Sequence, residues 1–153
     1  MPRITPFLWY ETQAEEAATF YTSIFPNSKI LKIARYPEGG PGPAGGVMTV
    51  EFELDGQRMT ALNGGPHFKF NEAISLVIEC KDQAEVDHYW TKLTAGGGQE
   101  SMCGWLKDRY GLSWQVVPDV LLELMRGPKA KKVMQAFMQM KKFDIAALER
   151  AAA

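Results

Sequence analysis

The sequence predicts an α+β fold in which two βαβββ modules form a curved mixed sheet, shaped as a cup, followed by C-terminal helices. Three observations predict this fold. A helix-capping pattern occurs twice, as Thr12-Gln13-Ala14-Glu15 and as Asp82-Gln83-Ala84-Glu85. The apolar residues of the two helices that follow repeat with the same spacing, 69 positions apart. In each half, later strands are joined at a turn signal, Asp55-Gly56 or Tyr110-Gly111.

The first module is expected to cover about residues 4–64. Its strands are predicted from aromatic and branched residues at 4–10, 30–36, 47–54 and 58–63. The helix that follows the first strand ends before Pro26-Asn27, because proline cannot continue a helix. Residues 37–46 are rich in glycine and proline and are predicted to form a loop between two strands.

The second module is expected over about residues 72–118, and a helical tail over about residues 119–150. Its strands are predicted at residues 72–80, 101–106 and 112–117. Gly96-Gly97-Gly98 ends its helix, and Pro128 divides the tail into two helical pieces. We expect the two modules and the tail to form a single domain of residues 1–153.

The composition is that of an ordinary globular protein, with 46% hydrophobic and 23% charged residues. The net charge of −1 provides no positive field, so neither nucleic acid nor a membrane is expected as a partner. No apolar run approaches the ~20 residues of a membrane span. The N-terminus lacks the apolar core of a signal peptide, and two cysteines are too few for a disulfide framework. We therefore expect a cytoplasmic protein with reduced thiols.

Alternation along the strands divides their side chains between two faces. The face expected to pack under the helices is apolar and comprises Phe7, Trp9, Met48, Val50, Phe52, Leu54, Met59, Ala61, Ile74, Leu76, Ile78, Trp114 and Val116. The other face is mixed and comprises Leu8, Tyr10, Thr49, Glu51, Glu53, Arg58, Thr60, Ser75, Val77, Glu79, Ser113, Gln115 and Val117. A mixed face is either simply solvated, as in many antiparallel sheets, or lines a ligand cavity. The repeat favours the cavity, since two half-sheets can face each other.

Four runs of the sequence resemble a known family. They are FYTSIFPNS at residues 20–28, ALNGGP at 61–66, FKFNEAIS at 68–75 and CGWLKDRYGLSWQVVP at 103–118. These runs resemble the PhnB-like proteins, also described as the 3-demethylubiquinone-9 3-methyltransferase-like domain. That group is part of the vicinal oxygen chelate superfamily, with glyoxalase I, the extradiol dioxygenases and the bleomycin resistance proteins. The resemblance implies a glyoxalase-like cup of paired βαβββ modules and a homodimer, but it supplies no activity.

The resemblance also implies where a metal would be bound. Metal-binding members of the superfamily carry ligands at positions that correspond here to Pro6, Thr60, Ser75 and Gln115. Divalent metals in such enzymes need imidazole or carboxylate ligands, whereas proline offers no side-chain ligand and hydroxyls are poor ones. We therefore expect no metal, which argues against glyoxalase I and extradiol dioxygenase chemistry.

The methyltransferase label of the family is not supported by a cofactor motif. A methyl donor of the nucleotide kind would need a glycine-rich turn between a strand and a helix N-terminus. The glycine-rich residues 39–46 are predicted to lie between two strands and contain two prolines, which indicates a flap instead. No cofactor is expected.

The candidate ligand-binding residues are taken from the mixed face and from the loop after the first module. They are Tyr10, Thr49, Glu51, Arg58, Thr60, Asn63, His67, Ser75 and Gln115. Catalysis without a metal would depend on His67, Glu51 or Gln115. For His67 the simpler alternative is a surface histidine, and for Glu51 and Arg58 it is an ion pair.

Two functional hypotheses remain open. The first is a metal-independent protein that binds a small, partly aromatic molecule in the cup. The second is a metal-independent enzyme of the glyoxalase or PhnB-like type. The absence of metal ligands favours binding, and Cys80 and Cys103 are expected to be inert, buried thiols.

Overall fold

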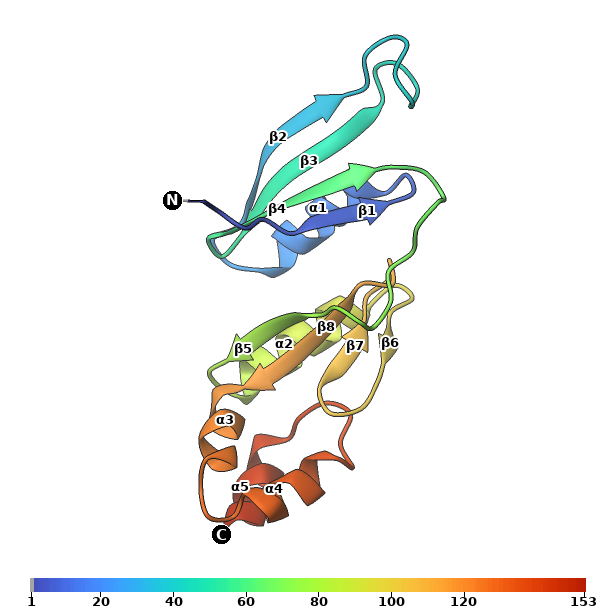
Figure 1. The fold of residues 1–153 in the computed structure, drawn as a ribbon. Coiled ribbons are helices and arrows are strands. Elements are labelled where there is room, and N and C mark those ends of the chain that lie inside the picture. Colours follow the sequence, from blue (N-terminus) through green and yellow to red (C-terminus); the bar gives the residue numbers. More distant parts are fainter. Residues whose placement is uncertain (1) are drawn as a thin grey trace. The chain divides into compact units, whose positions relative to one another are not determined.

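The structure, a computed structural model, describes residues 2–153. It divides into two compact units, with the boundary between Phe70 and Asn71, and each is described by itself (Figure 1). This boundary falls between the two predicted modules. We call them the N-terminal unit and the C-terminal unit.

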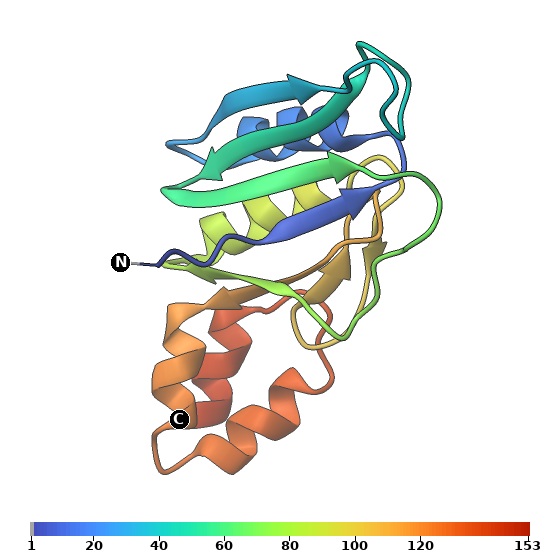
Figure 2. The ribbon, with the colours of Figure 1, turned by 45° about the horizontal axis from the view of Figure 1, so that its top comes forward.

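The N-terminal unit is one βαβββ module. Its elements are β1 (Phe7–Tyr10), α1 (Ala14–Ile24), β2 (Lys29–Arg35), β3 (Val47–Leu54) and β4 (Gln57–Asn63). The strands form one sheet in the order β1-β4-β3-β2, in which β1 and β4 are parallel and the other pairs antiparallel. Helix α1 packs on one face of this sheet, mainly against β3 and β4 (Figure 2).

The C-terminal unit repeats the same topology. Its elements are β5 (Leu76–Cys80), α2 (Gln83–Thr94), β6 (Gln99–Glu100), β7 (Trp105–Lys107) and β8 (Ser113–Pro118). The sheet order is β5-β8-β7-β6, again with one parallel pair, β5 and β8. The predicted repeat and the α+β fold class are therefore confirmed.

Three helices, rather than the two predicted pieces, follow β8. They are α3 (Asp119–Met125), α4 (Ala130–Phe137) and α5 (Ile145–Ala152). Their shared core consists of Leu121, Val133, Phe143 and Leu148, all buried. Helix α5 begins after Asp144, whose side chain accepts a hydrogen bond from the backbone N–H of Ala147. None of the helices within residues 2–153 has the length and apolar character that crossing a membrane requires.

The two predicted capping boxes have different outcomes. At α2, Asp82 accepts from the backbone N–H of Glu85 at 2.9 Å, and the Glu85 carboxylate accepts from the backbone of Lys81. The second box is therefore confirmed. The first is wrong, because α1 has no side-chain cap from Thr12 or Gln13. Its first N–H group is bound by a residue distant in sequence, as described below.

Strand β1 presents to α1 the face opposite to the one predicted. Its parallel register places Leu8 beside Ala61 and Phe7 beside Thr60. Leu8 and Tyr10 are therefore buried on the helix side, whereas Phe7 is 61% exposed on the mixed side. The phase could not be read from the sequence, because Phe-Leu-Trp-Tyr is apolar or aromatic at every position.

Candidate ligand-binding site

The N-terminal unit contains a cavity of about 740 Å³ at the end of β1 and β4, which we call the Trp9 pocket. Its walls are apolar and include Trp9, Tyr36, Met48 and Leu62, together with prolines of two loops. A volume of this size suits a small organic molecule, since ligand pockets span roughly 300–1,000 Å³.

Trp9 is fixed by the loop that follows β4. Its Nε1 donates a hydrogen bond of 2.9 Å to the carbonyl oxygen of Gly65. Gly64 lies so close that a Cβ there would come within 2.4 Å of the indole ring. The ring of Phe68 makes an edge contact with Trp9, with ring centroids 4.8 Å apart. The glycines of the ALNGGP run therefore allow the backbone to pack directly on the indole.

Tyr36 forms a second wall and organises the glycine- and proline-rich loop. The backbone N–H of Tyr36 binds the carbonyl of Gly46, and its carbonyl accepts from Gly45, at 2.8 and 2.9 Å. The loop then folds back so that a Cβ on Gly42 would lie 2.4 Å from the Tyr36 ring. The Tyr36 hydroxyl donates to the carbonyl oxygen of Asn63. Residues 37–46 therefore connect β2 to β3 as a hairpin loop, as predicted, and contribute to the pocket wall.

Asn63 lines the pocket, but its side chain is committed to structure. Its Oδ1 accepts from the backbone N–H of Ala14 at 2.8 Å, and its Nδ2 donates to the carbonyl of Val47 at 3.1 Å. Asn63 thus binds the start of α1 in place of Thr12 and joins it to β3. A contact across 49 positions leaves no local signal in the sequence.

Polar groups at the pocket come from Glu11, Thr12 and His67, all exposed. The imidazole of His67 makes an edge contact with Trp9, with ring centroids 6.4 Å apart. The pocket therefore offers aromatic surface inside, with a carboxylate, a hydroxyl and an imidazole to orient a polar group of a ligand. Of the residues that line the pocket, His67 and Asn63 are among the candidates predicted from the sequence, whereas Trp9 and Tyr36 are not. The phase error in β1 had assigned Trp9 to the core.

Tyr10, the predicted aromatic wall, lies on the other side of the sheet. It is 3% exposed, and its hydroxyl is 2.9 Å from the hydroxyl of Tyr21 in α1. The prediction that Tyr10 lies on the mixed face is therefore wrong, because the side chains of β1 alternate in the phase opposite to the one predicted.

The other predicted residues of the N-terminal unit lie along the mixed face of the sheet, outside the pocket lining. Glu51 and Arg58 approach to 3.9 Å as an ion pair, with side chains 40% and 43% exposed. Thr60 pairs with Glu51 across β3 and β4, and Thr49 pairs with Leu62. These residues therefore share one face, but the structure does not bring them together with His67 in the Trp9 pocket.

In the C-terminal unit, Ser75 and Gln115 are brought together. The Gln115 Nε2 donates to the Ser75 hydroxyl at 2.9 Å. At the corresponding place in the N-terminal unit, the backbone N–H of Thr60 binds the carbonyl of Pro6 at 3.0 Å. The positions compared with metal ligands are thus neighbours in pairs, and their side chains offer hydroxyls and one amide. Within residues 2–153, no three His, Cys, Asp or Glu side chains are grouped as a metal would need.

The two thiols lie in different environments. Cys80 is fully buried at the end of β5, and burial, followed by the charges of nearby carboxylates, raises its pKa to about 12. This agrees with the predicted inert core thiol. Cys103 is only partly buried, so the prediction that it is buried is wrong.

The comparisons with known proteins address this fold and these motifs. The sequence model of the family described as 3-demethylubiquinone-9 3-methyltransferase matches residues 2–117. Comparison with the curated proteins gives no match. Among solved structures, the chain is similar to a PhnB protein from Bacillus cereus at 39% identity. The match covers 76% of this chain and 99% of that one, with a TM-score of 0.70.

Two further solved structures show the fold alone, because their identities are low. One is a fosfomycin resistance protein from Listeria monocytogenes, solved with Mn(II) and sulfate, which is 12% identical to this chain. The match covers 82% of this chain and 95% of that one, with a TM-score of 0.57. The other is a glyoxalase/bleomycin resistance protein from Albidiferax ferrireducens, at 10% identity, 74% and 95% coverage, and a TM-score of 0.51. With its repeated βαβββ topology, the chain belongs to the 3-demethylubiquinone-9 3-methyltransferase (PhnB-like) family.

Proposed function

We propose that the protein binds a small, partly aromatic organic molecule in the Trp9 pocket, without a metal. The observation that carries this proposal is the pocket itself, an apolar cavity of about 740 Å³ walled by Trp9 and Tyr36. Trp9 is fixed by a hydrogen bond to Gly65 in the loop after β4, and Tyr36 by one to Asn63 at the end of β4, so the walls are preorganised. A flat aromatic ligand would stack or make edge contacts with them, and His67 or Glu11 would bind its polar end.

Binding is favoured over catalysis by the placement of the candidate catalytic residues. A general base needs a partner that orients it within hydrogen-bond reach. Within residues 2–153, His67 has no hydrogen-bond partner, and Glu51 and Gln115 do not line the pocket with it. Among the described residues of the Trp9 pocket, an enzyme of this kind would have to rely on His67 or Glu11 as its base.

Methyl transfer from a nucleotide-type donor, which the family description suggests, does not fit the chain. The phosphate- or carboxylate-binding turn of such a site lies between a strand and a helix. Here the glycine-rich residues 37–46 close a hairpin between β2 and β3. The turn between β1 and α1 is Glu11-Thr12-Gln13, which has no glycine and a carboxylate that would repel an anion.

The proposal is tested by measuring binding of a small library of neutral aromatic compounds by NMR, with the Trp9 indole N–H as the reporter. His67→Ala removes a pocket side chain that is exposed and carries no structural hydrogen bond, so the fold should be retained. We expect about a three- to five-fold loss of affinity for compounds that perturb Trp9, as one weakened polar contact implies. His88→Ala is the matched control, because His88 is exposed on α2 and outside the pocket.

Two results would count against binding in the Trp9 pocket. One is that no compound shifts the Trp9 resonance at millimolar concentration. The other is that His67→Ala and His88→Ala change affinity equally. The cytoplasmic location and the homodimer remain proposals that accompany this function.

A further inference from the structure

A second cavity, of about 370 Å³, lies within the C-terminal unit between the mixed face of its sheet and the C-terminal tail. We call it the tail pocket. Strands β5, β7 and β8 form its floor through Val77, Glu79, Trp105 and Gln115. The tail forms its other wall, with Leu122 of α3, Phe137 of α4 and Phe143 of the following loop among its lining residues.

The tail that completes this pocket lies outside the residues matched by the family model, which end at 117. The Bacillus cereus structure likewise leaves about a quarter of this chain unmatched while being covered almost completely itself. The tail pocket is therefore built from a family-typical sheet face and an added wall. It is separate from the Trp9 pocket, with which it shares no lining residue.

The added wall is held on the unit by specific contacts. The backbone N–H groups of Cys103 and Gly104 donate to the carbonyls of Met140 and Lys141, both at 2.8 Å. Gly104 has φ +80°, and a Cβ there would lie 2.3 Å from the ring of Phe143. Phe143 is 2% exposed, so the glycine permits a close, well-packed contact between the tail and the turn that precedes β7.

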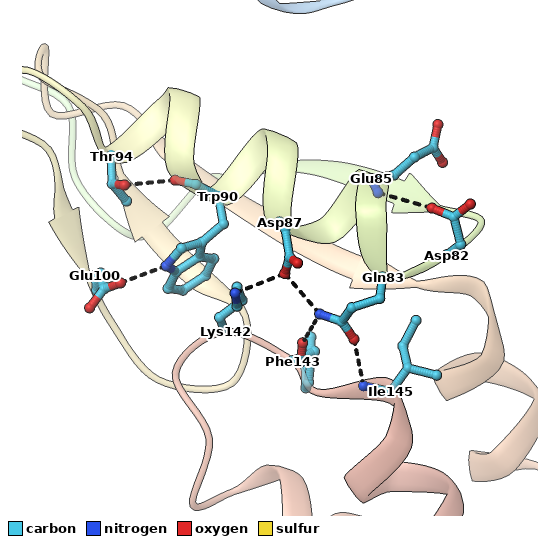
Figure 3. A network of polar contacts seen from close by, with 10 residues as sticks. All are labelled: Asp82, Gln83, Glu85, Asp87, Trp90, Thr94, Glu100, Lys142, Phe143 and Ile145. Carbon is cyan, nitrogen blue, oxygen red and sulfur yellow. Dashed lines mark hydrogen bonds and ion pairs between the residues drawn. The ribbon is translucent and has the colours of Figure 1, made fainter.

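Side chains of α2 hold the tail from the other side (Figure 3). The Gln83 amide donates to the carbonyl of Phe143 at 3.0 Å and accepts from the backbone of Ile145 at 2.8 Å. Lys142 pairs with Asp87 at 2.8 Å. The hydrogen bonds from Lys142 and Gln83 lower the pKa of Asp87. These contacts fix the tail wall in place.

The polar groups that line the tail pocket favour a positively charged ligand. Glu79 is the only charged residue among those that line it, and it is exposed on β5. No Lys, Arg or His lines the pocket among the described residues. Gln115 uses its Nε2 to donate to Ser75, which leaves its amide oxygen as an acceptor. Three aromatic rings, those of Trp105, Phe137 and Phe143, complete the lining.

A carboxylate, an amide oxygen and aromatic faces all favour a donor-rich cation. The exposed apolar side chains at the pocket, Val77 at 55% and Leu122 at 43%, favour an apolar body on the same ligand. We propose that the tail pocket binds a small organic ammonium ion with an apolar or aromatic body. This inference is independent of the ligand proposed for the Trp9 pocket.

The test compares three probes of nearly equal shape: 2-phenylethylammonium, 2-phenylethanol and phenylacetate. Binding to the full chain is followed by the indole N–H resonance of Trp105, with buried Trp114 on the opposite face as an internal reference. We expect the ammonium ion to bind about three- to five-fold more tightly than the alcohol, as a partly exposed charge pair implies, and phenylacetate to bind most weakly.

Two pairs of variants locate the effect. Glu79→Gln should abolish the preference for the ammonium ion, whereas Glu53→Gln, on the mixed face of the other sheet, should leave it unchanged. Leu122→Ala should lower the affinity for the ammonium ion and for the alcohol by the same factor. Met134→Ala should change neither affinity, because Met134 does not line the pocket. It is the matched control, since its side chain is as exposed as that of Leu122, at 43%.

The proposal is overturned if the three probes bind with equal affinity, or if the preference for the ammonium ion persists in Glu79→Gln. It is also overturned if the Trp105 indole resonance does not shift at millimolar concentrations of 2-phenylethylammonium. A response of Trp9 alone would also overturn it. That result would leave the proposed function of the Trp9 pocket untouched, so the two failures are distinguishable.

Discussion

At the scale of single residues, Gly64 is the position where the backbone packs most tightly on the indole of Trp9. A Cβ at this site would lie 2.4 Å from the ring, a distance that requires either the ring or the loop to move. We predict that Gly64→Ala destabilises the fold by about 1–3 kcal/mol, as overpacking does, and shifts the Trp9 indole resonance. Urea unfolding and NMR measure the two effects.

Gly127→Ala is the matched control for this change. Its Cβ would meet nothing closer than 3.4 Å, and its φ is not in the left-handed region. Its unfolding free energy should therefore change little. Equal destabilisation by the two variants would show that Gly64 has no special contact with Trp9.

The two cysteines give a second prediction at this scale. In the folded protein near pH 8, iodoacetamide should modify Cys103 and spare Cys80, because Cys80 is fully buried and its pKa is raised to about 12. Mass spectrometry after proteolysis identifies the modified site, and unfolding in urea should make both thiols reactive. Modification of Cys80 at the same rate as Cys103 in the native protein would contradict this assignment.

The raised pKa of Cys80 also has a consequence for stability. An unfolded thiol ionises near pH 9, whereas the folded one stays neutral until about 12. The neutral, buried Cys80 thiol therefore costs the folded state nothing below pH 9. As the pH rises from 9 towards 12, ionisation of the unfolded thiol progressively lowers the free energy of unfolding. Cys80→Ala should remove that alkaline dependence.

At the scale of elements, the start of α1 depends on Asn63 rather than on the local Thr12. The Asn63 side chain binds both Ala14 and Val47, and removing it takes these hydrogen bonds from the first N–H of α1 and from the Val47 carbonyl. We predict that Asn63→Ala lowers the unfolding free energy by about 1–3 kcal/mol. Thr12→Ala should change it by less than about 0.5 kcal/mol, as surface substitutions usually do.

Denaturant unfolding of both variants measures this difference. Asp82→Ala is a reference of known type, because Asp82 caps α2 locally and should cost about 1 kcal/mol. A larger loss for Thr12→Ala than for Asn63→Ala would show that the local capping box forms in solution.

Elements whose pattern is local and periodic could be predicted from the sequence. The two βαβββ modules, the hairpin at Asp55-Gly56 and the alternation of β3 and β8 are examples, because polar and apolar residues there define the phase. Strand β1 could not be phased, since all of its four residues are apolar or aromatic. The first capping box failed because a distant amide outcompeted the local hydroxyl.

The candidate site could be predicted only in part, for related reasons. His67 and Asn63 were identified because polar residues after a strand and near glycines suggest a rim. Trp9 and Tyr36 were missed, because nothing in the sequence shows that a loop folds back onto them. The tail pocket was missed because two of its wall residues, Phe137 and Phe143, lie well beyond the end of β8 in the sequence.

At the scale of the whole molecule, the assembly state remains a prediction. The apolar residues of the tail are largely covered within its own unit, where Phe137 and Met140 pack on the tail core. Exposed apolar side chains nevertheless remain, including Met138 at 55%, Ile4 at 91% and Phe7 at 61%. With the family resemblance, they favour a homodimer. Light scattering at micromolar concentration should give twice the mass of the chain, and a monomer mass would contradict it.

The proposed function requires that the Trp9 pocket binds a small aromatic molecule. Crystals of the full chain soaked with the neutral aromatic compounds that shift the Trp9 resonance test it most directly. We expect electron density between the rings of Trp9 and Tyr36, with the polar end of the compound towards His67 or Glu11. Compounds that bind only elsewhere, or a pocket closed by inward movement of residues 37–46 in every crystal, would contradict it.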